Sequence, residues 1–391
     1  MKAEQALSIA DLHRLARRRL PRILFDCIES GTEDEYALSD NESAFRSYRL
    51  LARCLVDVTV RDQSLTVFGR SYASPFGLGP TGYAGLFRAG ADGMLARAAK
   101  AAEIPFILSG ASVATPEEVA SEAPRHVWYH LYAAKDSAIS ADLMRRAAAA
   151  GYETLVLTVD NPVLPKRERD MRNGFALPLK LKPSILIEAL THPGFILDYY
   201  RHGGLPSMGS WAAYAPPGSD ASAVGQFFRQ QSPSIQTWAS LAELRRLWPG
   251  KLVLKGIQHP EDAVRAVDEG IDGVIVSNHG GKAYDMLPTP LFSLPAVKAA
   301  VGGRIPVMFD SGIRRGSDIL IARALGADFV FVGRATLYGV VAGAERGAAR
   351  AIAILRDEVD RGLAMIGCPR IADLDAGWLR PAGPPTKDVT A

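Results

Sequence analysis

Residues 273–285 read GVIVSNHGGKAYD, an apolar run that passes directly into Ser-Asn, a histidine, two glycines and a lysine. A short apolar run that ends in polar and small residues is typical of a buried strand followed by a loop. The same pattern recurs along the chain, and the eight runs begin at Phe76, Pro105, Val127, Thr154, Leu252, Gly273, Pro306 and Phe329. The quoted stretch is therefore one copy of a unit that predicts the fold.

Segments with helical periodicity lie between most of these runs, for example DGMLARAAKAA from Asp92 and PEDAVRAVDEG from Pro260. Alternating strands and helices indicate right-handed βαβ units and a parallel sheet. Eight units predict an α/β fold, a (β/α)8 TIM barrel, as one domain over residues 1–391 with a helical segment at its N-terminus. A doubly wound open sheet is the alternative, but no G-x-G-x-x-G follows the first strand.

The spacing changes after the fourth strand, where residues 161–250 form an insertion. Its stretch 179–204 is expected to be partly helical and apolar, whereas 207–228 is expected to be loop-like. A gap of this length in a barrel is usually a lid or an interaction surface. Contact with a membrane surface or a partner subunit is one interpretation, and packing on the chain's own barrel is the other.

The composition excludes several classes of function. With 45 basic and 42 acidic residues the net charge is +3, which gives no reason to expect nucleic-acid binding. Cys27, Cys54 and Cys368 form no C-x-x-C pair, so neither a disulfide framework nor a metal site is expected. The N-terminal residues predict an amphipathic helix and no signal peptide, and no apolar stretch could span a membrane, so a cytoplasmic location is expected.

Catalytic residues of such barrels lie at the C-terminal ends of the strands. These positions hold hydroxyls, histidines, acids and cations: Pro80, Thr81, Gly82, Ser109, His130, Tyr132, Thr158, Asp160, Lys255, Asn278, His279, Asp310, Ser311, Gly333 and Arg334. His279 is a candidate base if Asp160 orients it, although a strand-end histidine is often structural. Lys255 ends an apolar strand, so its charge should be paired or functional.

The last two strands lead into FDSGIRRGSD and VGRATLYG, two loops that combine glycine with arginine. Such loops often bind phosphate through backbone N–H groups, and Arg314, Arg315 and Arg334 would add charged donors. The alternative is that the arginines form ion pairs with Asp310 and Asp318. Two Gly-Arg loops at consecutive strand ends favour phosphate.

Together these motifs resemble the FMN-dependent α-hydroxy-acid oxidases and dehydrogenases. The resemblance runs from RLPRILFDCIESGTEDEYA to AMIGCP, and GPTGYAGLF, LTHPGFILDYYRHGG and GRATLYG are similar to the mandelate-oxidising branch. It implies FMN as cofactor and the oxidation of an (S)-2-hydroxy acid, of the aromatic mandelate type, to the 2-keto acid.

The resemblance also implies residue roles. It makes His279 the base, Asp160 its partner, Tyr132 a substrate contact, Arg167 a ligand of the substrate carboxylate and Lys255 a stabiliser of negative charge on the flavin. Gly82 would face both substrate and flavin. The residues that it assigns to FMN are Pro80, Thr81, Gly82, Ser109, His130, Thr158, Lys255, Ser277, Asp310, Gly312, Arg314, Gly333 and Arg334.

Three positions depart from the family pattern. Lys282 stands where the family usually has an arginine that grips the carboxylate, and Cys27 stands where a tyrosine provides a second contact. His130 replaces a glutamine that contacts the flavin. Lysine lacks the planar guanidinium with which arginine makes two hydrogen bonds to one carboxylate. The substrate-binding residues Lys282 and Cys27 therefore imply an altered geometry of carboxylate binding.

These changes leave two alternatives to a mandelate-type enzyme: a tailoring oxidase for an α-hydroxy ester or amide, and a weakly catalytic FMN-binding protein. The resemblance further implies oxygen or a quinone chain as electron acceptor, peripheral attachment to the inner face of the cytoplasmic membrane, and a homotetramer. The sequence itself gives no independent reason to expect this acceptor, the membrane attachment or the homotetramer.

Overall fold

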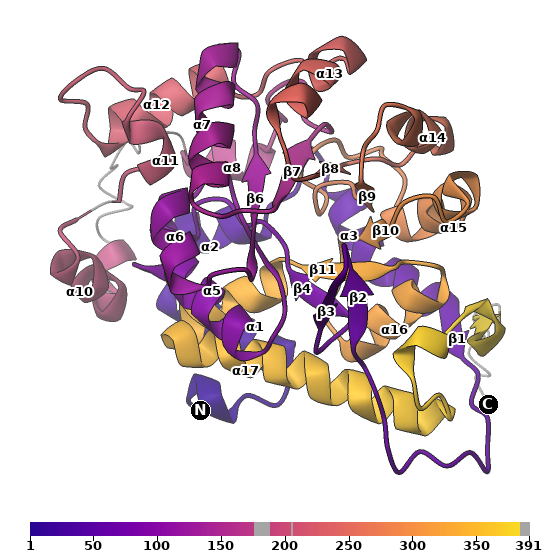
Figure 1. Cartoon of the computed structure of the whole chain (residues 1–391). Helices are drawn as coiled ribbons and strands as arrows, with labels where there is room; N and C mark the ends of the chain where they lie inside the picture. Colours follow the sequence, from indigo (N-terminus) through magenta and orange to yellow (C-terminus); the bar gives the residue numbers. More distant parts are fainter. Residues whose placement is uncertain (176–187, 205, 384–391) are drawn as a thin grey trace.

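A computed structural model describes residues 1–175, 188–204 and 206–383 (Figure 1). Eight parallel strands close a barrel in the order β10-β11-β4-β5-β6-β7-β8-β9. Their bounds are β4 (Phe76–Leu78), β5 (Phe106–Leu108), β6 (Val127–Leu131), β7 (Thr154–Thr158), β8 (Lys251–Lys255), β9 (Gly273–Val276), β10 (Val307–Phe309) and β11 (Phe329–Val332). Each predicted run supplies one strand, so the predicted (β/α)8 barrel is confirmed.

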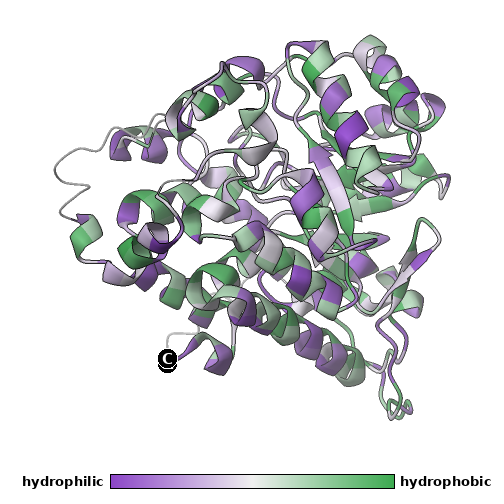
Figure 2. Ribbon diagram, turned by 60° about the vertical axis from the view of Figure 1, so that its left-hand side comes forward, coloured by the Kyte–Doolittle hydropathy of each residue, from purple (hydrophilic) through white to green (hydrophobic). Residues whose placement is uncertain are grey.

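Helices cover the outside of the barrel. Those that connect its strands are α4 (Ala84–Phe87), α5 (Ala91–Ala101), α6 (Pro116–Glu122), α7 (Ser137–Ala149), α14 (Pro260–Asp268), α15 (Pro290–Val301) and α16 (Gly316–Ala324). After β11 follows α17 (Arg334–Ile366), which leaves helical geometry at Gly343 and Ala344. Hydrophilic and hydrophobic residues alternate along these outer helices (Figure 2), as expected where one face packs on the barrel.

Segments at both ends of the chain complete the molecule. They are η1 (Ala3–Gln5), α1 (Ile9–Arg19), α2 (Arg22–Glu29), α3 (Tyr36–Ser43), η2 (Ala44–Ser47), β1 (Tyr48–Leu50), η3 (Ile371–Asp373), η4 (Ala376–Trp378) and β12 (Leu379–Pro381). The predicted amphipathic helix is α1, which begins where Ser8 and Asp11 form a capping box. β12 pairs antiparallel with β1, so the C-terminal segment packs beside the end of the segment that precedes the barrel.

The apolar core has two parts. One cluster lies between barrel and helices. The other consists of side chains from β5 to β11, including Trp128, Phe329 and Phe331, together with Val67 and Tyr72 from a hairpin. That hairpin joins β2 (Leu65–Val67) to β3 (Arg70–Tyr72). The inside of the barrel is therefore packed with side chains, as in other barrels of this type.

The insertion after β7 contains α8 (Glu168–Asn173), α10 (Pro193–Arg201), α11 (Gly209–Ala212), α12 (Ala221–Gln231) and α13 (Trp238–Leu247). Figure 1 shows α10, α11 and α12 gathered on one side of the barrel. The expectation of a loop over 207–228 is wrong for the residues of α11 and α12 and holds for 213–220, which form neither helix nor strand. Asp220 caps α12 by accepting from the Ala223 N–H at 2.8 Å, and Val224 and Phe228, four residues apart, bury one face.

The structure describes only part of the predicted apolar stretch 179–204, because 179–187 lies outside the described residues. Its second half forms α10, which is helical as expected. In the part of the chain that the structure describes, no helix combines the length and apolarity needed to cross a membrane.

Candidate active site

A cavity of about 610 Å³ opens where the barrel strands end. Five residues at or after the strand ends line it: Pro80 after β4, Lys255 at the end of β8, and His279, Asp310 and Gly333 after β9, β10 and β11. The size suits a small-molecule site, and the C-terminal end of a barrel is where such sites occur.

His279 and Asp160 form a buried pair at this cavity. His279 Nδ1 lies 2.9 Å from Asp160 Oδ1, and the Tyr132 hydroxyl lies 3.1 Å from His279 Nε2. An ionised carboxylate can only accept hydrogen bonds, so Nδ1 carries the proton and donates a hydrogen bond to Asp160. Nε2 is then the basic nitrogen that faces Tyr132, which also lines the cavity.

The ionisation of the pair suits a base. Burial lowers the pKa of His279, although Asp160 opposes that effect, so the imidazole is neutral near pH 7. Burial alone would raise the pKa of Asp160, but the neighbouring His279 and Lys255 outweigh it and lower that pKa. A neutral imidazole beside an ionised carboxylate can accept a proton and hold it.

Local backbone geometry permits this pairing. Gly256 follows β8 with φ 108°, and a Cβ there would lie 2.4 Å from the Asp160 Cβ. Only glycine tolerates both that φ and that approach. His279 itself has φ 60°, and its N–H donates to Ser277 Oγ at 3.0 Å.

Lys255 places a buried cation at the wall of the cavity. Its Nζ lies 3.2 Å from Asp310 Oδ2 and donates to Ser277 Oγ at 2.9 Å. Burial would lower the pKa of Lys255, but Asp310, Asp160 and Tyr132 outweigh it, and the pKa is raised. The ammonium therefore stays charged, as a group that stabilises negative charge must.

The loops after β10 and β11 offer donors to an anion. Gly312, Arg314, Gly333 and Arg334 line the cavity, and Gly333 is the residue from which α17 starts. N–H groups of the first turn of a helix lack intrahelical acceptors and favour a phosphate. Arg314 Nη2 pairs with Glu42 at 2.7 Å, and Arg334 donates to the carbonyls of Ile28, Gly280 and Ser30.

This donor set fits the phosphate of FMN. Arg334 still has two of its five N–H donors left after those three hydrogen bonds. The expectation that Arg315 also serves the phosphate is wrong, because it pairs with Glu358 at 2.9 Å and does not line the cavity. The predicted pairing of arginines with Asp310 is not seen either, since Asp310 pairs with Lys255.

Four predicted flavin contacts lie behind the cavity wall. Ser109, His130, Thr158 and Ser277 are buried and are not among the lining residues. His130 Nε2 meets the Thr158 hydroxyl, and the Gly110 N–H donates to His130 Nδ1 at 3.4 Å. Burial lowers the pKa of His130 well below its usual range, so the side chain is neutral. In this arrangement His130 supports Thr158.

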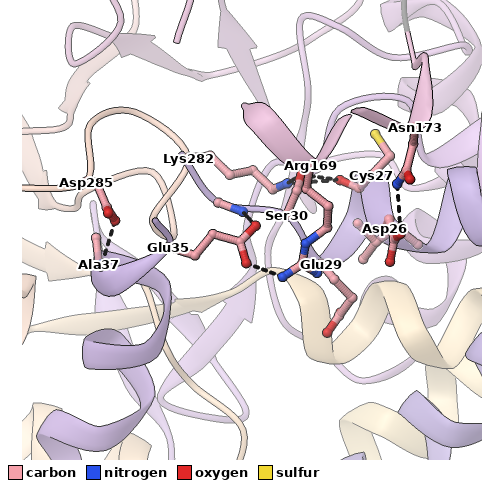
Figure 3. Close-up of polar contacts among 12 residues, drawn as sticks. Asp26, Cys27, Glu29, Ser30, Glu35, Ala37, Arg169, Asn173, Lys282 and Asp285 are labelled. Carbon is pink, nitrogen blue, oxygen red and sulfur yellow. Dashed lines mark hydrogen bonds and ion pairs between the residues drawn. The ribbon is translucent and has the colours of Figure 1, made fainter. Parts of the chain in front are cut away.

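Lys282 turns toward the N-terminal segment (Figure 3). Its Nζ donates to the Cys27 carbonyl at 2.9 Å and to Ser30 Oγ at 3.3 Å. Burial, followed by the charges of Arg334 and Arg167, lowers the pKa of Lys282 to about 7. Burial raises the pKa of Cys27 to about 12, so its thiol stays protonated. Cys27, Lys282, Arg167 and Gly82 all line the cavity.

The insertion contributes cavity residues that the sequence did not single out: Asn161, Leu164, Asp170, Met171, Phe175, Phe228 and Arg229. Tyr83 also lines the cavity. Its position directly after the strand-end residues Thr81 and Gly82 was the available signal. The insertion residues carried no such signal, because they follow no strand end whose position would place their side chains.

Known proteins resemble the chain over nearly its whole length. The family model described as FMN-dependent dehydrogenase matches residues 16–381. (S)-Mandelate dehydrogenase of Pseudomonas putida is 38% identical over 381 residues, which covers 97% of this chain and 95% of that protein. A putative L-lactate dehydrogenase of Mycobacterium tuberculosis is 38% identical, covering 97% of this chain and 92% of the relative.

Solved structures of related proteins have the same fold. The crystal structure of the monotopic membrane protein (S)-mandelate dehydrogenase superimposes with a TM-score of 0.93 at 38% identity, covering 97% of this chain and all of that one. A mandelate oxidase with (S)-4-hydroxymandelic acid gives a TM-score of 0.83 at 34% identity, covering 96% and 98% of the two chains.

Proposed function

The chain belongs to the FMN-dependent dehydrogenase family, and on that premise we propose that its substrate is an aromatic (S)-2-hydroxy acid of the mandelate type. FMN as cofactor and 2-hydroxy-acid oxidation as chemistry follow from the family, as the motifs predicted. The aromatic substrate rests on one observation: Leu164, Met171, Phe175 and Phe228 line the same cavity as His279. Burying an aromatic ring against such side chains is favourable.

The residues of the site then have separate roles in the oxidation. FMN, when bound, accepts the two electrons that the substrate loses as its carbinol carbon becomes a carbonyl. The carbinol loses two hydrogens with those electrons: His279 Nε2 takes one as a proton, and the other would pass to FMN. Asp160 stabilises the imidazolium that results, and the Tyr132 hydroxyl orients the substrate oxygen. Lys255 stabilises negative charge that develops beside it.

Arg167 is the ligand that we propose for the substrate carboxylate. It lines the cavity, and its Nε has no hydrogen-bond partner among the described residues. Its Nη2 donates only weakly, to the Lys282 carbonyl at 3.4 Å. A half-buried guanidinium with unused donors suits a carboxylate.

The experiment is an anaerobic flavin-reduction screen with (S)-mandelate, L-lactate, glycolate, and the methyl ester and amide of mandelate. We expect (S)-mandelate to bleach the flavin fastest. Faster bleaching by lactate would contradict the aromatic preference. A yellow protein that no hydroxy compound reduces would instead support a weakly catalytic FMN-binding protein.

One observation favours a second candidate, a tailoring oxidase for an α-hydroxy ester or amide. The Lys282 ammonium is bound to the Cys27 carbonyl and Ser30 Oγ, so the cavity has less charge to offer a free acid. Under this candidate the ester reduces the flavin faster than the free acid does. A Lys282→Arg, Cys27→Tyr double variant then gains activity on acids, whereas a loss would count against this candidate.

We further propose that α10 attaches the protein peripherally to a membrane. The homologous (S)-mandelate dehydrogenase is a monotopic membrane protein. Here Leu190, Leu197 and Tyr200 are 72%, 46% and 83% exposed. Arg19 of α1 binds Asp198 at 3.2 Å, which places the basic end of α1 beside this apolar surface. Apolar residues flanked by arginines are typical of an interfacial helix.

Attachment of this kind would bring the active site close to a lipid-soluble acceptor. We therefore propose a membrane quinone in preference to oxygen as the oxidant. Oxygen consumption by the purified enzyme with substrate, compared with substrate-dependent quinone reduction in membranes, separates the two. Rapid oxygen consumption would contradict the proposal.

A further inference from the structure

Tyr83 has an uncommon backbone conformation. It precedes α4 with φ 58° and ψ 24°, in the left-handed region that a bulky residue rarely adopts. Among the described residues that line the cavity, the other non-glycine residues with positive φ are His279 and Ser311. Such strain persists only where the surroundings impose it, and it gathers at functional sites.

Several hydrogen bonds impose this conformation. The Tyr83 N–H donates to the Ala111 carbonyl at 2.9 Å, and the Leu86 N–H donates to the Tyr83 carbonyl at 2.8 Å. The Tyr199 hydroxyl of α10 donates to the Gly85 carbonyl at 2.9 Å, which ties α4 to the insertion. The fold therefore holds the Tyr83 backbone in this conformation.

The phenol lies on the cavity side. Burial raises the pKa of Tyr83, and the other groups that shift it are Cys27, Arg229, Tyr132 and Arg167. All four line the cavity. The hydroxyl is thus protonated and can donate, and it makes no hydrogen bond to another described residue.

A substrate carboxylate needs more donors than Arg167 alone. Lys282 is held by Cys27 and Ser30, and the Cys27 thiol is a weak donor. Tyr83 is a strong donor near both Arg167 and Cys27 whose hydroxyl no described residue uses. We propose that the Tyr83 hydroxyl donates a hydrogen bond to the substrate carboxylate, as the second ligand beside Arg167. This inference rests on the proposed function.

The test measures binding by the FMN-loaded enzyme without turnover. Benzoate and benzamide, an anionic and a neutral probe of similar shape, are titrated against wild type and Tyr83→Phe while the flavin absorbance is followed. We expect Tyr83→Phe to weaken benzoate binding about 10- to 100-fold, as for a hydrogen bond to a charged group, and to leave benzamide within about twofold. Cys27→Tyr added to Tyr83→Phe should restore part of the benzoate affinity.

Unchanged benzoate binding in Tyr83→Phe, or equal losses for both probes, would overturn the inference. So would a wild-type enzyme that binds no benzoate. Thermal unfolding and FMN retention of Tyr83→Phe should match wild type, which separates lost binding from lost folding. The proposed function fails on a different result, namely a flavin that no 2-hydroxy acid reduces.

Discussion

Lys282 is the residue whose charge we expect to change near neutral pH. Its pKa of about 7 is lowered by burial and then by Arg334 and Arg167, so the ammonium is present below pH 7 and lost above it. A carboxylate is attracted only by the charged form. We therefore expect KM for mandelate to rise by up to roughly tenfold between pH 6 and pH 8.5, because about 1.4 kcal/mol corresponds to a tenfold change.

Two controls accompany this pH profile. Methyl mandelate carries no charge, so its KM should stay flat. Lys282→Arg keeps its charge throughout, so its KM for mandelate should stay flat as well. A rise in KM that persists in Lys282→Arg would show that another group titrates.

His279 is expected to control the rate of the chemical step, in which the substrate reduces the flavin. Replacing it by glutamine removes the basic nitrogen, and we expect flavin reduction in stopped-flow to slow by about 10² to 10⁴-fold. FMN affinity should change little. Because the pKa of His279 is lowered from 6.5, the wild-type rate should fall only as pH drops below that value, through protonation of the imidazole. A slow wild-type rate at pH 7 that recovers only at higher pH would contradict this assignment.

Asp160→Asn tests the partner of that base. We expect slower reduction here too, because the amide stabilises the imidazolium poorly. FMN retention is the control.

Several of these residues could be predicted because they stand at strand ends. His279, Lys255 and Asp160 each follow or end an apolar run, so barrel geometry brings them together whatever the loops do. Tyr83 could not be predicted in the same way. Its role depends on a left-handed φ and on the distant Cys27, and neither can be read from the stretch GPTGYAGLF.

At the scale of elements, the loop after β8 is a place where a small change should disturb the catalytic pair. Gly256→Ala places a Cβ 2.4 Å from the Asp160 Cβ. Asp160 must then move away from His279, and we expect a loss of about 1–3 kcal/mol in unfolding free energy together with slower flavin reduction. Thermal unfolding and stopped-flow measure the two effects.

Gly270→Ala is the matched control, because Gly270 has φ 73° but open space around its Cβ position. It should cost stability without slowing flavin reduction. Equal kinetic losses in both variants would argue against displacement of Asp160 as the cause.

The insertion marks the limit of prediction for elements. Pro-Pro-Gly-Ser-Asp suggests a loop, yet the aspartate is the N-cap of α12. The helix is stabilised by tertiary contacts, with Phe228 packed on the fully buried Trp211 at 4.9 Å between ring centroids. A local pattern does not reveal such a partner, because most helical stability in proteins comes from packing.

At the scale of the whole molecule, the N-terminal segment and the insertion both close on the open end of the barrel. Asn41 of α3 exchanges two hydrogen bonds with Asn278, at 2.8 and 2.9 Å, and Arg334 ties residues 28 and 30 to Gly280. On the other side Trp211 donates to the Gly110 carbonyl at 2.8 Å. The Tyr199 hydroxyl of α10 donates to the Gly85 carbonyl of α4, and Phe87 of α4 lines the cavity, so the surface formed by α10 is linked to the cavity through α4.

The outward face of α10 should govern membrane attachment. Ile196, Leu197 and Tyr200 are 38%, 46% and 83% exposed, and a serine at each position removes apolar area without touching the buried Tyr199. Burying a large apolar side chain contributes about 1.5–3 kcal/mol, so the triple serine variant should bind vesicles of phosphatidylglycerol and phosphatidylcholine at least roughly tenfold more weakly. Cosedimentation measures the bound fraction.

The control for this prediction is Met365→Ser, a 78% exposed apolar residue near the end of α17. It removes one exposed apolar side chain from a different element, so vesicle binding should stay at the wild-type level. Flavin reduction by mandelate should be the same in all three proteins, because none of the changed residues lines the cavity. If the α10 variant and Met365→Ser cosediment equally with vesicles, attachment does not occur through α10. Arginines at the end of α1 would then be the next residues to test, since they act through charge and their contribution would fall at high salt.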